Sequence, residues 1–393
     1  MKIKLGVIFG GETVEHEVSI ISALQAIKNI DKDKYDVVPI YISKDRIWYT
    51  GEDLSDIEIY KDLETVKKNS KEVTLCKVNN EFSLLSTKGL FNKVVNTIDV
   101  AFPIVHGQNV EDGTLVGYLS TIGIPFVGCD VLGAALGQDK VVMKQVFASS
   151  NIPIVDYTWF YDTEYLNDEE KCLKAIKKLG YPVVVKPACL GSSVGINYVK
   201  NEKGIKDAIN EAIKYDKKIL IEKAVENLLE VNCSVVGNVD NQETSVIEEV
   251  MSNNTILTYE DKYIGNSKTK GKTSGSKGMV NASRIIPARI TDEIKSEVER
   301  ISKEAFKALN LSGVCRIDFL IDSKNNKVYV NEPNTIPGSL SFYLWEPTGK
   351  KYSKLLDEII KLGIKDYKNK EKKTCHFDTN ILKNFNGTKG VKK

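Results

Sequence analysis

Strand-like apolar runs alternate with helix-like segments over the first 130 residues, and this alternation narrows the choice of fold most. Residues 3–10 form an apolar run that ends at Gly10, and the apolar spacing of residues 17–29 is typical of a helix with one buried face. Further β-branched runs, a helical segment and a short strand are predicted at 36–43, 97–105, 114–122 and 125–128. Alternating strands and helices predict a parallel sheet of the α/β class.

The rest of the chain continues this mixture. The polar stretch 45–93 is interpreted as short β-hairpins, and a helix over 131–149 is predicted to open a second unit. Strands are then predicted at 157–160, 182–187, 194–199, 218–222, 232–237, 315–321 and 327–332, and helices at 168–179, 203–214 and 291–309. A loop rich in Gly, Ser, Thr, Asn and Lys spans 264–279, and the lysine-rich end from residue 365 predicts a helical end followed by a frayed tail.

Charge and cysteine usage exclude several classes of function. The 55 Lys and Arg residues against 53 Asp and Glu give a formal net charge of +2, too small to drive binding to nucleic acid or to an anionic membrane. We expect a cytoplasmic protein, because the start of the chain lacks signal-peptide features and no stretch reaches the roughly 18 apolar residues of a membrane span. The seven cysteines are scattered singly, which disfavours both a disulfide framework and a zinc site.

The strongest local chemistry lies on two predicted strands near residues 316 and 332. Because side chains alternate along a strand, Arg316 and Asp318 share one face of the first, and Glu332 and Asn334 share one face of the second. Paired antiparallel strands would bring these groups together, and hard oxygen ligands of this kind suit Mg²⁺ that bridges nucleotide phosphates. The alternative is a solvated hairpin with ordinary surface charge.

Several lysines and glycines form weaker candidates for a phosphate site. Lys186 ends an apolar strand just before the glycine-rich segment 191–195, whose backbone N–H groups could point at phosphate, although a plain tight turn explains it as well. Lys140 and Lys144 would be a solvated helix face in isolation. No P-loop or dinucleotide-binding glycine fingerprint is present, so a dehydrogenase has little support, and Glu15-His16-Glu17 does not fit a zinc protease.

Taken together, these segments resemble the D-alanine–D-alanine ligases of the ATP-grasp superfamily over about residues 3–338. The segments that carry the resemblance are GGETVEHEVSI (10–20), HGQNVEDGT (106–114), DKVVMK (139–144), VVVKPACLGSSVG (183–195), YEDKY (259–263), RIDF (316–319) and NEPNTIPG (331–338). The resemblance implies ATP-dependent ligation of two D-alanines for peptidoglycan precursor synthesis. The first carboxylate would be phosphorylated, and the amine of the second amino acid would then attack the acyl phosphate.

The resemblance also implies an α/β fold of three domains, with a Rossmann-like parallel sheet at the N-terminus. These domains would span 1–128, 129–221 and 222–364, the last with a lid at 264–279, followed by a tail at 365–393. ATP and two Mg²⁺ (or Mn²⁺) ions would be the cofactors, small D-amino acids the substrates, and a homodimer is compatible with the family. Nucleic acid and membrane are not expected as partners.

The same resemblance assigns roles to individual residues. ATP would be held by Lys140, Lys186, Glu222, Lys223, Glu230 and Lys262. The metal ions would be bound by Asp318, Glu332 and Asn334. The first amino acid would be fixed, and the lid docked, by Glu15, Ser192 and Tyr263. The developing oxyanion would be stabilised by Arg316 and the backbone N–H of Gly338.

The chain departs from the family pattern at Val110, at Val116 and over 339–347. The last segment helps to bind the second amino acid, so a ligase with another acceptor, such as D-serine, stays open. A nucleotide-binding paralogue without catalysis is the alternative of a different class, and the intact metal and arginine set argues against it. Phe342, Tyr343 and Trp345 either pack beneath the C-terminal helix or line the acceptor pocket. In the second case they would favour D-alanine over D-serine.

Overall fold

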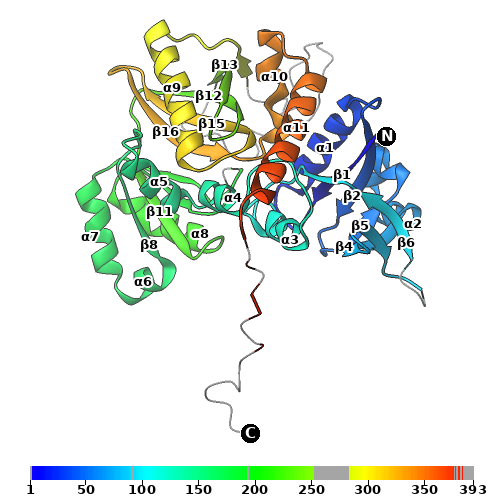
Figure 1. Cartoon of the computed structure of the whole chain (residues 1–393). Helices are drawn as coiled ribbons and strands as arrows, with labels where there is room; N and C mark the ends of the chain where they lie inside the picture. The colour runs from blue at the N-terminus through cyan, green and yellow to red at the C-terminus, as the bar shows by residue number, and fades with distance from the viewer. Residues whose placement is uncertain are drawn as a thin grey trace.

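The computed structural model describes residues 2–89, 93–192, 194–251 and 283–375, together with 377, 379, 380 and 383. Three sheets organise this part of the chain, and Figure 1 shows them as three groups of strands with helices packed around and between them. The expected lid at 264–279, with Lys262 and Tyr263 at its base, lies outside the described residues. Within the described residues, no helix combines the length and the apolar character needed to cross a membrane.

The N-terminal sheet has seven strands in the order β6-β5-β4-β3-β2-β1-β7. The first strand pairs in parallel with β2 and β7, and the other strands extend the sheet as antiparallel neighbours. The strands are β1 (Ile3–Gly10), β2 (Tyr35–Ile42), β3 (Trp48–Thr50), β4 (Lys71–Val78), β5 (Glu81–Ser86), β6 (Val94–Ile98) and β7 (Val100–Pro103). The helices of this unit are α1 (His16–Asn29), α2 (Leu63–Asn69) and α3 (Thr114–Ile122). The predicted parallel α/β core is confirmed.

Three of the sequence-based boundaries are wrong. The run 97–105 is two strands, because Asp99 breaks it by accepting the backbone N–H of Lys4 at 2.8 Å. The strand expected at 125–128 is reduced to one bridge between Ala101 and Phe126. The helix expected over 131–149 is two helices, α4 (Val131–Gln138) and α5 (Lys140–Ser149), because the Asp139 carboxylate caps the second by accepting two backbone N–H groups.

The second sheet has four strands in the order β10-β9-β11-β8, all antiparallel. Its strands are β8 (Tyr157–Tyr161), β9 (Val183–Pro187), β10 (Asn197–Val199) and β11 (Lys218–Lys223). Its helices are α6 (Asp162–Asn167), α7 (Glu169–Leu179) and α8 (Ile205–Ile213), which bury a shared apolar core against the sheet.

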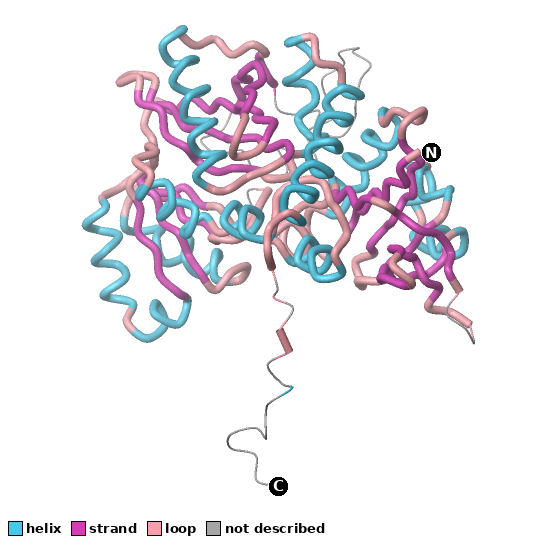
Figure 2. Tube along the Cα trace, viewed as in Figure 1, coloured by secondary structure: helices cyan, strands magenta, loops and turns pink. Residues whose placement is uncertain are grey.

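The third sheet has five antiparallel strands in the order β14-β13-β12-β15-β16. These are β12 (Leu228–Gly237), β13 (Gln242–Met251), β14 (Ser283–Ile285), β15 (Gly313–Asp322) and β16 (Lys327–Asn334). One face packs on α9 (Asp292–Ala308), and α10 (Phe342–Trp345) and α11 (Tyr352–Glu371) follow β16 along the chain. Figure 2 shows the strands of all three sheets in magenta, with α11 running between the N-terminal and the third sheet. The helical end expected beyond residue 365 is confirmed as far as Glu371.

One apolar core joins the first and last parts of the chain. It combines β1 and α1 with Trp345 and the buried face of α11. The Tyr35 hydroxyl also donates to Asp357 of α11 at 3.0 Å. This shared core fixes the N-terminal sheet against the region that follows β16, so loops from both can line one cavity.

Candidate active site

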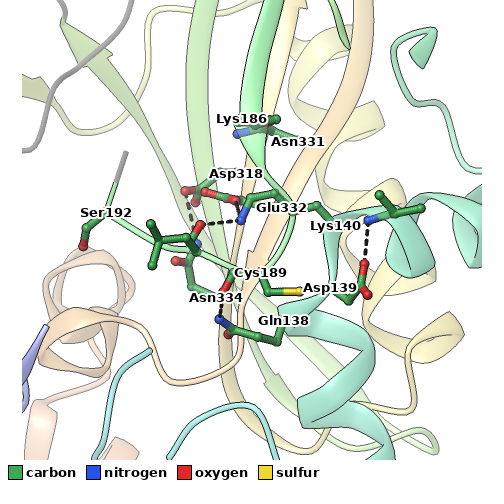
Figure 3. A network of polar contacts seen from close by, with 12 residues as sticks. Gln138, Asp139, Lys140, Lys186, Cys189, Ser192, Asp318, Asn331, Glu332 and Asn334 are labelled. Atoms are coloured by element: carbon green, nitrogen blue, oxygen red, sulfur yellow. Dashed lines mark hydrogen bonds and ion pairs between the residues drawn. The ribbon is translucent and has the colours of Figure 1, made fainter. Parts of the chain in front are cut away.

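The floor of the site is one face of the five-stranded sheet. Asp318 lies opposite Glu332 of β16 and opposite Asn232 of β12, while Arg316 lies opposite Asn334. The expected meeting of these groups on paired antiparallel strands is therefore confirmed, and all of them line one cavity. Figure 3 shows Asp318, Glu332 and Asn334 gathered where lysines of the second unit approach the sheet.

A fork of two hydrogen bonds joins Arg316 to Asp318. The Arg316 Nε and Nη2 atoms donate to the two carboxylate oxygens of Asp318, each at 2.7 Å. The Asn334 amide donates to Asp318 Oδ2 at 3.2 Å. Burial of the guanidinium disfavours its charge, but the adjacent carboxylate outweighs this and holds the pKa of Arg316 well above its ordinary value. Arg316 is therefore a fixed positive charge beside the metal-type oxygens.

Two lysines reach the floor from the second unit. Lys140, the first residue of α5, pairs with Glu332 at 2.9 Å and donates to the Leu190 carbonyl at 2.9 Å. Burial acts to lower the pKa of Lys140, yet the Glu332 charge raises it overall. Lys186, on β9, donates to Asn331 at 3.2 Å and also contacts Glu222. Both lysines thus point at the third sheet, as phosphate-binding groups would.

Lys144 does not have the setting of the solvated helix face that was considered for this segment in isolation. It is fully buried rather than part of a solvated helix face, and it pairs with Glu222 at 2.5 Å. Burial would raise the pKa of Glu222, but Lys144 and Lys186 lower it to about 2. Burial also lowers the pKa of Lys144. The face of α5 that carries Lys144 is buried because β11 packs over it. The periodicity of the helix sequence gives no information about this packing.

The wall opposite the sheet comes from the N-terminal unit. The Ser192 hydroxyl donates to Glu15, and Gly191 lies against the same carboxylate, close enough that a Cβ atom there would stand 2.9 Å from Glu15 Oε2. Gly338 lines the cavity at the end of the loop that follows β16. The predicted neighbours Glu15 and Ser192 are therefore brought together.

Glu111 and His106 line the same cavity, and sequence reasoning gave them no role. The Glu111 carboxylate accepts the backbone N–H groups of Gly107 and Ile336, each at 2.9 Å. Burial, reinforced by the charge of Glu15, raises the pKa of Glu111 to about 7. Burial lowers the pKa of His106 to about 4, so its ring is neutral at physiological pH. Both residues belong to the segment 106–114, whose resemblance to the ligase family was the sequence signal that could have indicated a place in the site.

The residues expected to bind adenine and ribose lie in the same cavity. Glu222, Lys223 and Glu230 all line it. The Lys223 ammonium, however, donates to the carbonyls of Tyr181 at 2.7 Å and Gly180 at 3.2 Å, so it supports β9 in this structure. A nucleotide would therefore meet the backbone that follows β11 rather than this ammonium.

Comparison with known proteins places this geometry in a family. The model described as D-ala D-ala ligase N-terminus matches residues 4–129, and the model described as D-ala D-ala ligase C-terminus matches residues 146–361. The chain is 41% identical over 381 residues to the D-alanine–D-alanine ligase of Thermosipho melanesiensis, covering 97% of this chain and 98% of that relative. It belongs to the D-alanine–D-alanine ligase family. The corresponding ligase of Thermoanaerobacter sp. (strain X514) is 39% identical over 373 residues, covering 94% and 98%.

Solved structures of this ligase family share the fold. The VanG D-Ala:D-Ser ligase from Enterococcus faecalis aligns with a TM-score of 0.76 at 29% identity, covering 92% of this chain and 100% of that one. The D-alanine–D-alanine ligase from Coxiella burnetii aligns with a TM-score of 0.77 at 27% identity, covering 94% and 96%. The expected ATP-grasp fold is confirmed.

D-alanine–D-alanine ligases use ATP and Mg²⁺, and the oxygen donors of this site fit that ion. Asp318 and Glu332 offer carboxylates and Asn334 offers an amide oxygen, all hard ligands that suit Mg²⁺. No cluster of three or more His, Cys, Asp or Glu with metal-binding geometry occurs in the part of the chain that the structure describes, and the Asn334 amide oxygen would be the third oxygen donor beside the two carboxylates. Arg316 and Lys140 neutralise the two carboxylates in this structure.

Proposed function

We propose that this chain joins two D-alanine molecules at the expense of ATP and supplies the dipeptide for peptidoglycan precursors. One observation carries the proposal: a single cavity collects Glu15, Lys140, Arg316, Glu332 and Gly338 in a member of the D-alanine–D-alanine ligase family. A carboxylate–amine ligation that proceeds through phosphate transfer needs these kinds of groups in one place.

Phosphate binding falls to the lysines of the second unit. Lys140 and Lys186 would hold the ATP phosphates, with Lys186 oriented by Glu222, while the backbone after β11 and Glu230 would bind adenine and ribose. Mg²⁺ bound by Asp318, Glu332 and Asn334 would neutralise the charge that accumulates on the transferred phosphoryl group. The lysines occupy their present ion pairs until phosphate oxygens replace the carboxylates.

The reaction itself requires no protein nucleophile. A carboxylate oxygen of the first D-alanine forms a bond to the γ-phosphorus and ADP leaves. The amine of the second D-alanine then attacks the acyl carbon, phosphate leaves with the bonding electron pair, and the amine loses a proton. Glu15 and Ser192 would hold the ammonium of the first D-alanine. Arg316 and the N–H of Gly338 would stabilise the tetrahedral oxyanion.

The test is phosphate release from ATP and Mg²⁺ with D-alanine, followed by mass analysis of the dipeptide. Arg316→Ala should lower kcat by about 100-fold or more and leave KM for ATP less affected, because the charge acts mainly in the transition state. Arg300→Gln, on the exposed face of α9, is the matched control and should change neither constant. A wild-type protein that yields no dipeptide overturns the proposal, and D-alanyl-D-serine as the main product from mixed amino acids changes the acceptor.

We also propose that the protein acts in the cytoplasm as a homodimer, with the three domains bounded near residues 128, 221 and 364. Family resemblance supports these statements, and the core shared by β1 and α11 supports a fixed arrangement of the first and third units. Sedimentation velocity measurements at several protein concentrations test the dimer, since a monomer throughout would exclude it.

A further inference from the structure

A second carboxylate–arginine group lies on the face of the sheet that carries the proposed metal ligands. The register of the strands sets Glu248 of β13 opposite Asn232, which in turn lies opposite Asp318. Glu248 is fully buried and lines the cavity. A buried carboxylate is costly unless it is hydrogen-bonded and paired, so its partners show what it serves.

In the part of the chain that the structure describes, three side chains from three elements bind Glu248. The Asn232 amide donates to Oε1 at 2.9 Å, the Tyr343 hydroxyl donates to the same atom at 3.0 Å, and Arg284 Nη1 lies 3.5 Å from Oε2. Burial raises the pKa of the Tyr343 hydroxyl to about 12, so the hydroxyl keeps its proton at neutral pH. Glu248 thus ties α10 and β14 to the sheet at the edge of the cavity.

Of the partners of Glu248, Arg284 is the one suited to bind a further group. Its guanidinium carbon lies 4.8 Å from the centre of the Tyr343 ring, and its side chain is 20% exposed and lines the cavity. Among the described residues, stacking on one face and one ion pair hold the planar group, and these contacts leave several of its N–H donors available. An arginine arranged in this way is suited to bind a carboxylate through two hydrogen bonds.

A further cation in the cavity would suit the proposed reaction. The second D-alanine enters with its own carboxylate beside the negatively charged phosphoryl group, while Arg316 is already committed to Asp318 and to the developing oxyanion. We infer that Arg284, held by Glu248 and Tyr343, binds the α-carboxylate of the acceptor amino acid. This inference rests on the proposed function and assigns the specificity for a free carboxylate to residues on β13, β14 and α10.

A neighbouring pair shows why a purely structural role is the weaker explanation. Glu249 and Arg289 form a similar ion pair at 2.5 Å, but Glu249 alternates to the opposite side of β13 and Arg289 is 62% exposed. Neither of these residues lines the cavity. Of two neighbouring glutamates on β13, therefore, Glu249 pairs with an exposed arginine, whereas Glu248 pairs with an arginine that lines the cavity.

The experiment offers D-alanine and D-alaninamide together as acceptors. D-alaninamide has no carboxylate to phosphorylate, so it can enter only as the second substrate, and mass analysis separates D-alanyl-D-alanine from D-alanyl-D-alaninamide. We expect the wild type to favour the free acid. Arg284→Gln should reduce that preference by about tenfold or more, as expected for loss of a charge-assisted hydrogen bond, with KM for ATP unchanged.

Three further variants sharpen the result. Arg289→Gln should leave the product ratio as in the wild type, and Arg284→Lys should restore part of the preference because it keeps the charge without the planar fork. Tyr343→Phe, which keeps the stacking and loses one hydrogen bond to Glu248, should give a smaller shift than Arg284→Gln.

The outcomes separate the inference from the function on which it rests. An Arg284→Gln protein that makes dipeptide in the wild-type product ratio overturns the inference alone, and so does a rise confined to KM for ATP. A wild-type protein that makes neither product overturns the proposed function itself. If Arg284→Gln does not fold, the Arg284→Lys and Tyr343→Phe ratios decide, and wild-type ratios in both overturn the inference.

Discussion

At the residue scale, Gly191 shows how an absent side chain shapes the site. A methyl group there would lie 2.9 Å from one oxygen of Glu15 and 3.3 Å from the other, too close unless the carboxylate moves. Gly191→Ala should therefore raise KM for the first D-alanine by about tenfold, the effect of weakening one charged hydrogen bond, with an unchanged Tm. Steady-state kinetics at saturating ATP measure this. Gly204→Ala is the control, because its Cβ would meet only Val199 at 3.7 Å.

A second prediction at the residue scale concerns Glu111 and the pH dependence of kcat/KM. Its pKa of about 7 lies above the ordinary glutamate value, so the group gains a proton as pH falls through 7 and loses the charge that attracts its backbone donors at Gly107 and Ile336. We expect kcat/KM for D-alanine to decline below about pH 7. In Glu111→Gln, which cannot titrate and never carries this charge, kcat/KM should stay near the lowered level and show no decline around pH 7. Superimposable pH profiles for the two proteins would remove Glu111 from this role.

At the scale of elements, the turn between β16 and α10 was the part least open to prediction. Ser339, Leu340 and Ser341 all have positive φ angles, between 51° and 54°, a conformation that costs non-glycine residues roughly 1 kcal/mol or more each. Surrounding contacts hold it, including the bond from the Ser339 N–H to Ser22 at 2.9 Å. No local sequence signal marks such a turn, because the stabilising partners come from α1.

The aromatic side chains after this turn divide between two settings, of which packing beneath the C-terminal helix is the one observed for two of them. Phe342 stacks on Tyr352 with ring centres 4.5 Å apart, and the fully buried Trp345 donates to Ser234 at 3.0 Å, so these two pack beneath α11. Tyr343 instead joins Glu248 at the cavity. Helix spacing alone could not separate them, since α10 is a single turn. The preference for D-alanine over D-serine stays a prediction.

Trp345 gives the prediction that belongs to this element. Trp345→Phe removes the donor to Ser234 and leaves a gap in the core shared by α11 and β1. The expected cost is about 2–4 kcal/mol in the free energy of unfolding, from a lost buried hydrogen bond and reduced packing. Urea unfolding followed by circular dichroism measures it. An unchanged unfolding midpoint would show that α10 is not held by this contact.

At the scale of the whole molecule, local patterns predicted the elements, whereas packing between units decided the site. Alternation along β15 and β16 was enough to place Arg316, Asp318, Glu332 and Asn334 together. The burial of Lys144 was not predictable because it depends on β11, and Glu248 with Arg284 was missed because their meeting depends on the register of β12, β13 and β14. Contacts between residues far apart in sequence leave no periodic signal in either segment.

The ion pair between Lys140 and Glu332 links the second and third units across the cavity. A nucleotide and Mg²⁺ bound there would replace this single contact with several, so both ligands should raise Tm by mass action. We expect a non-hydrolysable ATP analogue with Mg²⁺ to raise the Tm of the wild type, and EDTA to remove most of the shift. In Glu332→Gln the nucleotide should stabilise equally with and without Mg²⁺, because the charged ligand is gone. Glu243→Gln, which only loses an exposed pair with Lys350, should behave as the wild type does. A full Mg²⁺-dependent shift in Glu332→Gln would place the metal elsewhere, and the two units would then be joined by the nucleotide alone.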